Sequence, residues 1–164
     1  MTAGQARAET RFLTPFAVLA IATADGHVTE IRYLPRHTAV RAPHDRVAER
    51  ACREIERYLD DPQHHFTLPY RLHGTPFRQR VWREIEKLFP VKTITYGEIA
   101  ARLRSSARAV GGACGANPVP LVVPCHRVLA AGGGLGGFMG GREDFPLTVK
   151  RWLLRHEGIL AAAD

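Results

Sequence analysis

Residues 96–115 read YGEIAARLRSSARAVGGACG, a stretch that predicts two short helices joined by a tight turn. The first helix is expected over residues 96–103, with an inward face made of Ile99, Ala100 and Leu103. The second runs from about residue 106 to residue 114 and ends at Gly115. Two short helices with so tight a connection match a helix-turn-helix, a motif with which many proteins dock on DNA.

Small residues dominate the second helix: Ala107, Ala109, Gly111, Gly112 and Ala113. Each glycine weakens a helix by about 1 kcal/mol relative to alanine. A helix that carries two of them is therefore expected to bring its backbone close to another surface. A DNA groove is one candidate for that surface, and tight packing against Cys125 is the other.

A cysteine and a histidine are adjacent in the segment Pro124-Cys125-His126-Arg127, which lies between the apolar runs 121–123 and 128–129. The thiolate is the reactive form of cysteine, and a nearby imidazole or cation favours it. A free thiol with a pKa of about 8.5 is only a few per cent thiolate at neutral pH. Adjacency alone leaves two interpretations open: a nucleophile with its base, or a buried cysteine beside a buried histidine.

Hydrophobic periodicity predicts further elements on both sides of these motifs. In the first half we expect a hairpin made of strands 15–22 and 28–34, followed by a helix over 44–59 whose apolar face holds Val47, Ala51, Ile55, Tyr58 and Leu59. A linker-like stretch, 61–74, precedes a helix that is capped by Thr75 and opened by Pro76. The remaining predictions are an extended piece at 93–95, a small hairpin over 128–135 and a final helix over 147–156. The linker suggests an N-terminal structural domain over residues 1–72 and a C-terminal domain over residues 73–164.

The composition restricts the partners and the compartment. The 164 residues carry a formal net charge of +7 and a pI near 9.9, which favours a polyanionic partner, nucleic acid first, although charge also serves solubility. Three cysteines without a CxxC pair argue against a disulfide framework and fit a reducing compartment. No zinc-finger spacing, membrane-spanning run or signal-peptide pattern is present, so we expect a cytoplasmic protein without metal, cofactor or membrane contact.

Four motifs in order resemble the methylated-DNA–protein-cysteine methyltransferases, the O6-alkylguanine-DNA alkyltransferases. They are the Tyr-Gly-Glu-Ile-Ala stretch at 96–100, GGACGANP at 111–118, VPCHRV at 123–128 and the Trp-Leu-Leu-Arg-His-Glu ending at 152–157. The resemblance covers about residues 74–158, and the N-terminal half matches loosely. It implies an α+β fold, in which a small N-terminal α/β domain of ribonuclease H-like type precedes a mostly α-helical, winged helix-turn-helix catalytic domain.

The resemblance implies a DNA repair protein that acts once. An O6-alkylated guanine is flipped out of the duplex, and Cys125 takes the alkyl group irreversibly, without a cofactor. It makes His126 a base that acts through a water, Glu157 the residue that orients the imidazole, and Tyr96 a donor to the purine. A soft nucleophile, its base and a donor are what displacement at an sp³ carbon requires. Without the resemblance, Glu157 would be a solvated charge and Tyr96 a half-buried aromatic.

The resemblance also implies which residues touch the DNA. Arg108 matches the arginine that fills the gap left by the flipped base, although by itself it would be one surface charge among many. The minor groove is the expected contact, by a monomer whose cooperativity on DNA stays open, through Ala107, Arg108, Gly111, Gly115 and Arg127. The expected guanine pocket is lined by Asn117, Pro120, Val128, Phe138 and Met139.

Two departures from the family pattern leave questions open. The turn at 103–106 lacks the usual proline, and the link at 140–146 is a few residues longer than usual. Because that link follows the pocket rim, the preferred alkyl size stays open. The competing functions are a non-catalytic DNA-binding damage sensor or regulator, whose relatives replace the cysteine, and a thiol hydrolase, which would turn over repeatedly.

Overall fold

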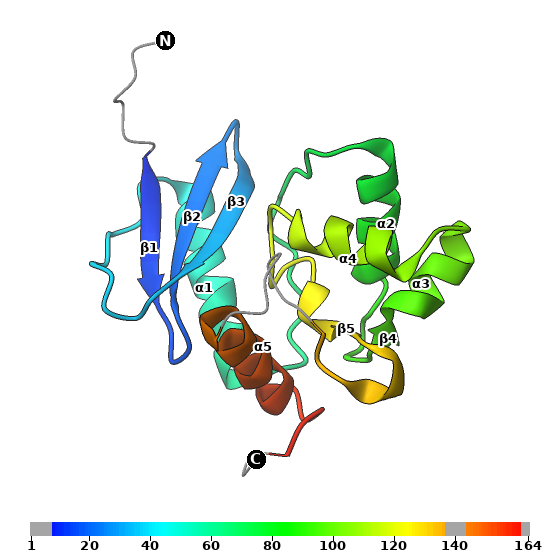
Figure 1. Cartoon of the computed structure of the whole chain (residues 1–164). Helices are drawn as coiled ribbons and strands as arrows, with labels where there is room; N and C mark the ends of the chain where they lie inside the picture. Colours follow the sequence, from blue (N-terminus) through cyan, green and yellow to red (C-terminus); the bar gives the residue numbers. More distant parts are fainter. Residues whose placement is uncertain (1–7, 137–143, 162–164) are drawn as a thin grey trace.

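The first half of the chain forms a three-stranded antiparallel sheet with strand order β1-β2-β3 (Figure 1). The strands are β1 (Glu9–Leu13), β2 (Val18–Ala24) and β3 (His27–Leu34). This computed structural model describes residues 8–136 and 144–161. The predicted hairpin is confirmed as β2 and β3, which turn at Asp25 and Gly26. Strand β1 was not predicted, because its sequence, ETRFL, has no apolar run; its buried Glu9 is instead held by ion pairs with Arg11 and Arg32.

Helix α1 (Arg46–Asp60) packs against β2 and β3 and confirms the helix predicted over 44–59. Its cap is Asp45, whose carboxylate accepts a hydrogen bond of 2.7 Å from the backbone nitrogen of Ala48. The face expected to be apolar is the buried one, and its Tyr58 ring is fully enclosed. The helix therefore brings a phenol hydroxyl to the inner side of the N-terminal half.

Three helices of the second half pack against one another: α2 (Pro76–Glu86), α3 (Tyr96–Leu103) and α4 (Ala107–Gly115). The side chains of Thr75, Thr95 and Ser106 cap them in turn, each accepting from a backbone nitrogen of the first turn. Between α3 and α4 the chain reverses at Arg104, which has left-handed backbone angles. The pair of helices predicted from residues 96–115 is confirmed.

The segment after α4 contains two 3₁₀ turns, η1 (Cys125–Arg127) and η2 (Ala131–Gly133), separated by strand β5 (Val128–Leu129). Strand β5 pairs in parallel with β4 (Ile94–Thr95), so the predicted extended piece is confirmed. The hairpin predicted over 128–135 is wrong. Its first residues find their partner in β4, far earlier in the chain, and its glycines make the tight turn η2 instead of a returning strand.

Helix α5 (Asp144–His156) returns the chain to the N-terminal half and lies beside α1 (Figure 1). The Trp152 ring lies 4.7 Å from that of Phe16, and His156 Nε2 donates to the carbonyl of Tyr58 at 2.7 Å. Buried residues of both halves join one hydrophobic core, and the α+β class is confirmed. The boundary near residue 72 stays a prediction. None of the helices in the described ranges has the length and apolarity that a membrane crossing requires.

Candidate active site

Cys125 opens the turn η1 directly after Pro124, and its side chain is 3% exposed. The Asn117 side chain donates two hydrogen bonds from Nδ2, to Cys125 Sγ at 3.1 Å and to the Val123 carbonyl at 2.8 Å. Its Oδ1 accepts from the backbone nitrogen of Val119 at 2.9 Å, which fixes the amide orientation. The turn after α4 thus holds the end of that helix against the cysteine segment.

His126 is fully buried, and its Nε2 lies 2.7 Å from Glu157 Oε2. A carboxylate accepts hydrogen bonds only, so Nε2 carries the hydrogen and donates it. Nδ1 then keeps its lone pair and has no hydrogen-bond partner among the described residues. The imidazole is therefore set up to accept a proton at Nδ1, the nitrogen opposite its carboxylate.

Glu157 accepts hydrogen bonds from three different side chains. Besides His126, Arg127 donates from Nε at 2.9 Å and from Nη2 at 3.0 Å, and the Tyr58 hydroxyl donates at 2.7 Å. The remaining Arg127 nitrogen, Nη1, donates to the carbonyl of Leu88 at 2.7 Å. The expectation that Arg127 contacts DNA is therefore corrected: its guanidinium is buried and used internally to hold Glu157.

Burial and the local charges set the protonation states of these groups. Burial raises the pKa of Cys125 well above its usual range, an effect that the Asn117 hydrogen bond and the Lys150 charge only partly oppose. Burial also lowers the pKa of His126, against the pull of Glu157. Burial would raise the pKa of Glu157, but His126 and Arg127 outweigh it and hold that pKa well below its ordinary value. At neutral pH the site therefore holds a neutral thiol, a neutral imidazole and a carboxylate.

Lys150 of α5 is a further buried group, which the sequence reasoning missed. Its ammonium donates to the carbonyls of Val128 at 2.8 Å and Leu135 at 2.5 Å, and to the Tyr96 hydroxyl at 3.4 Å. Burial lowers its pKa to about 8. The signal that was available is its position, one residue after Val149 and three before Leu153 on the apolar side of the helix.

The other predicted pocket residues are distributed around this centre. Tyr96 opens α3, and its hydroxyl is held near Val128 by the shared contact with Lys150. Pro120 and Asn117 line a cavity of about 340 Å³ that Cys125 also borders. Phe138 and Met139 lie outside the described residues, as does most of the long link at 140–146.

Helix α4 carries the other residues predicted to touch DNA. Ala107 and Arg108 are exposed, and Gly111 and Gly115 are half-buried. A Cβ added at Gly111 or Gly112 would meet no atom of the described structure within 4 Å. Packing against Cys125 is thus not the reason for these two glycines, and their backbone is open to a partner.

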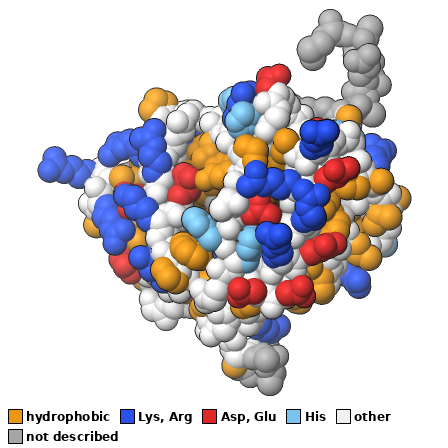
Figure 2. All heavy atoms as spheres, turned by 180° about the vertical axis from the view of Figure 1, so that it is seen from behind, with side chains coloured by type: hydrophobic (Ala, Val, Ile, Leu, Met, Phe, Trp, Pro, Cys, Tyr) orange, Lys and Arg blue, Asp and Glu red, His pale blue; other side chains and the backbone are white. Residues whose placement is uncertain are grey.

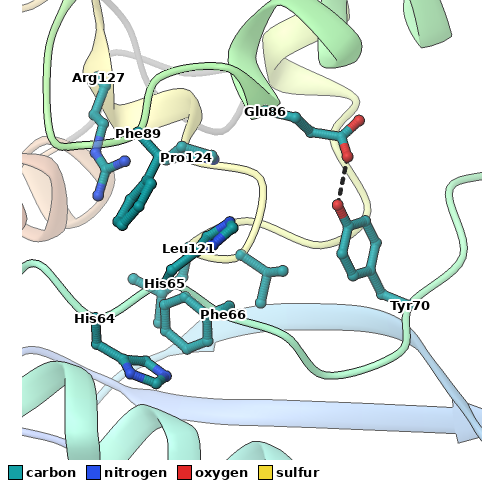
Figure 3. A pocket seen from close by; sticks show the side chains of 10 residues that line it. His64, His65, Phe66, Tyr70, Glu86, Phe89, Leu121, Pro124 and Arg127 are labelled. Carbon is teal, nitrogen blue, oxygen red and sulfur yellow. Dashed lines mark hydrogen bonds between the residues drawn. The ribbon is translucent and has the colours of Figure 1, made fainter.

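A second pocket, of about 90 Å³, is lined by residues that include Pro124 and Arg127 (Figure 3). In it the Tyr70 hydroxyl donates to Glu86, and His65 stacks on Phe89 with ring centroids 4.3 Å apart. These side chains are engaged with protein partners. On the face opposite that of Figure 1, basic side chains stand beside acidic ones and histidines (Figure 2).

Comparison with known proteins gives one consistent result. Residues 76–159 match the family described as 6-O-methylguanine DNA methyltransferase, DNA binding domain. A methylated-DNA–protein-cysteine methyltransferase of Salmonella typhimurium is 46% identical over 96 residues, which are 57% of this chain and 53% of that protein. The chain thus spans about half the length of this relative. A protein of the same name from Mycolicibacterium paratuberculosis is 36% identical over 147 residues, 84% of this chain and 88% of that protein.

Solved structures resemble the whole chain. The O6-methylguanine methyltransferase of Mycobacterium tuberculosis superposes with a TM-score of 0.77 at 32% identity, covering 95% of both chains. The structure of Mycobacterium tuberculosis OGT in complex with DNA superposes with a TM-score of 0.75 at 32% identity, covering 92% of both chains. The likeness therefore extends through the sheet of the N-terminal half, where the sequence motifs are weakest.

Proposed function

Because the chain belongs to the 6-O-methylguanine DNA methyltransferase family, we propose that it transfers the alkyl group of O6-alkylguanine in duplex DNA irreversibly to its own Cys125. The observation that carries the proposal is the buried network at this cysteine. Asn117 donates to the sulfur, and the adjacent His126 is bonded to an ionised Glu157. The relatives that carry the name methyltransferase support the same reaction.

The first step is removal of the proton from Cys125. A buried neutral thiol is a weak nucleophile, so the site needs a base at the moment of reaction. His126 Nδ1 accepts that proton through a water, and the imidazolium that forms faces the Glu157 carboxylate. Arg127 keeps Glu157 ionised, and so the carboxylate is ready to stabilise the new positive charge.

The second step is in-line displacement at the alkyl carbon. The thiolate sulfur forms a bond to the sp³ carbon while the bond from that carbon to guanine O6 breaks, and negative charge develops on the purine. Tyr96 donates its hydroxyl hydrogen to the purine, and the Lys150 ammonium on the same oxygen makes it a stronger donor. The product is a thioether, which is a poor leaving group, so each molecule reacts once.

DNA binding by α4 would present the lesion to this site. Arg108 is exposed on that helix and has the length and planar cation to enter the base stack, while Ala107, Gly111 and Gly115 let the backbone approach the minor groove. The relative crystallised in complex with DNA supports DNA as the partner. Affinity that comes from phosphate contacts falls steeply with salt. We also propose a cytoplasmic monomer with domains at 1–72 and 73–164, needing no metal or cofactor.

Intact mass spectrometry tests the proposal directly. The full chain is mixed with duplex DNA that contains O6-methylguanine, and we expect one methyl group per molecule, mapped to Cys125. The Cys125→Ala variant stays unmodified, and Cys52→Ala, a buried cysteine of α1, is modified like the wild type. Tight lesion binding without a mass increase would indicate a damage sensor, and repeated turnover a hydrolase; either result contradicts the proposal.

A further inference from the structure

A second cysteine borders the cavity that leads to Cys125. Cys114 lies in the last turn of α4, and both cysteines line the cavity of about 340 Å³ described above. The opposite wall is β3, which contributes residues 31–34. Cys125 is buried, whereas Cys114 is partly exposed. A small solute in this cavity therefore has both sulfurs in reach, and Cys114 is the more accessible of the two.

Asn117 connects the two cysteines in the structure. Its backbone nitrogen donates to the carbonyl of Cys114 at 3.2 Å, while its side chain donates to Cys125 Sγ at 3.1 Å. Cys114 is also close enough to act on the ionisation of its neighbour, because after burial it is the next largest cause of the raised pKa of Cys125. The positive charge of Lys150 interacts with both sulfurs. The two thiols thus form one cluster at the end of α4.

We propose that Cys114 and Cys125 are a redox pair, which hydrogen peroxide converts to a reversible disulfide. The modification would regulate alkyl transfer, and that consequence rests on the proposed function, whereas the disulfide itself does not. Cys52 lies apart in α1, where burial raises the pKa of its thiol to about 11, and it takes no part.

The chemistry needs one peroxide for each pair. The more accessible Cys114 sulfur, as its thiolate, attacks one peroxide oxygen, and the O–O bond breaks. Cys114 becomes a sulfenic acid, and the hydroxide that leaves takes up a proton to become water. The Cys125 sulfur then attacks the sulfenic sulfur, the S–S bond forms, the S–O bond breaks, and the leaving hydroxide takes the Cys125 proton away as a second water. Two thiols are oxidised by two electrons, and one hydrogen peroxide is reduced to two waters.

The pair would change the fate of the nucleophile under oxidation. A disulfide at Cys125 blocks alkyl transfer, because a neutral disulfide sulfur is a far weaker nucleophile than the thiolate that the reaction requires. It also keeps the oxidation reversible, since the Cys114 sulfenic acid is captured by the neighbouring Cys125 thiol before it reaches the irreversible sulfinic state. A protein that reacts only once per molecule would gain from keeping its nucleophile recoverable.

Peptide mapping of the peroxide-treated full chain tests the pair. We expect a mass loss of two hydrogens, a Cys114–Cys125 linked peptide under non-reducing conditions, loss of methyl transfer, and return of both thiols and activity with dithiothreitol. In Cys114→Ala and Cys114→Ser we expect no linked peptide and no loss of methyl transfer that dithiothreitol reverses, because the accessible thiol that reacts with peroxide is gone; Cys52→Ala forms the linked peptide like the wild type.

Two results would overturn the inference. One is a wild-type chain in which both thiols are oxidised independently and no linked peptide forms. The other is activity loss that dithiothreitol reverses equally in Cys114→Ala. If the linked peptide forms but the protein never accepts a methyl group, the redox pair is supported and the proposed alkyl transfer is refuted. The two proposals can therefore be tested independently.

Discussion

Removing the Tyr58 hydroxyl, by Tyr58→Phe, probes how the N-terminal half supports the candidate site. The hydroxyl donates to Glu157 Oε2 at 2.7 Å, and both groups are buried. A hydrogen bond to a charged group contributes about 1.5–3 kcal/mol to stability. Glu157 keeps its bonds from His126 and Arg127, so the carboxylate is not left unpaired. We therefore expect a loss of about 2 kcal/mol, which for a chain of this size lowers the Tm by about 4–8 °C.

The same change is expected to alter the pH dependence of alkyl transfer. Tyr58 and His126 share Glu157 Oε2 as acceptor. Without the phenol, Glu157 Oε2 accepts one hydrogen bond fewer, so its negative charge stabilises the protonated imidazole more strongly and the pKa of His126 rises. The acidic limb of the rate profile, where His126 becomes protonated and cannot act as a base, should therefore move to higher pH.

Urea denaturation measures the loss of stability. Single-turnover rates measured between about pH 5 and pH 8, which brackets the ordinary pKa of histidine, measure the shift of the acidic limb. Tyr70→Phe is the matched control, because Tyr70 also donates to a carboxylate, that of Glu86, but at the surface (Figure 3). Solvent can replace a hydrogen bond at so exposed a position, so we expect it to contribute less than the buried bond of Tyr58. If Tyr58→Phe costs no more than Tyr70→Phe and leaves the rate profile unmoved, the reasoning about Glu157 is refuted.

Three further predictions concern stability. The fold holds the pKa of Glu157 low, so on acidification the carboxyl group takes up a proton in the unfolded chain before it does so in the folded chain. The free energy of unfolding should therefore fall as the pH drops below about 4.3, which urea titrations at several pH values measure. Arg104→Gly should stabilise by up to about 1 kcal/mol, because φ is +54° there, whereas Ala101→Gly within α3 should cost about 1 kcal/mol; thermal melts separate the two signs. Gly74→Ala should destabilise by about 1–3 kcal/mol, because its Cβ would stand 2.5 Å from the buried Trp82 ring; an unchanged Tm would contradict this.

Local patterns in the sequence predicted the helices well, and non-local pairings explain the errors. The cap at Thr75 and the apolar face of α1 are local features, and the structure has them where the sequence indicates. Strand β1 and the β4–β5 pair depend on partners elsewhere in the chain, which periodicity does not identify. The same limit applies to Tyr58, whose partner Glu157 lies 99 residues away.

At the candidate site, too, the sequence indicated the residues but not the partners that they contact. The motif identified Cys125, His126 and Glu157, but only the fold brings Glu157 onto His126. Arg127 was expected to contact DNA as part of the family resemblance. Its place between the apolar runs 121–123 and 128–129 was the better guide, since an arginine there is buried and requires a carboxylate. Lys150 carries the same signal, a charge on the inner side of an apolar helix.

Burying Arg127 and Glu157 together costs desolvation energy that a well-packed apolar pair would not. The benefit of this ion pair is that it keeps Glu157 ionised and His126 oriented. Without Arg127, a buried Glu157 would tend to take up a proton, and it would then neither orient the neutral His126 nor balance the imidazolium that forms during the reaction. The ion pair therefore makes His126 usable as a base at a buried position. Cys125 needs such a base because burial keeps its thiol protonated at rest.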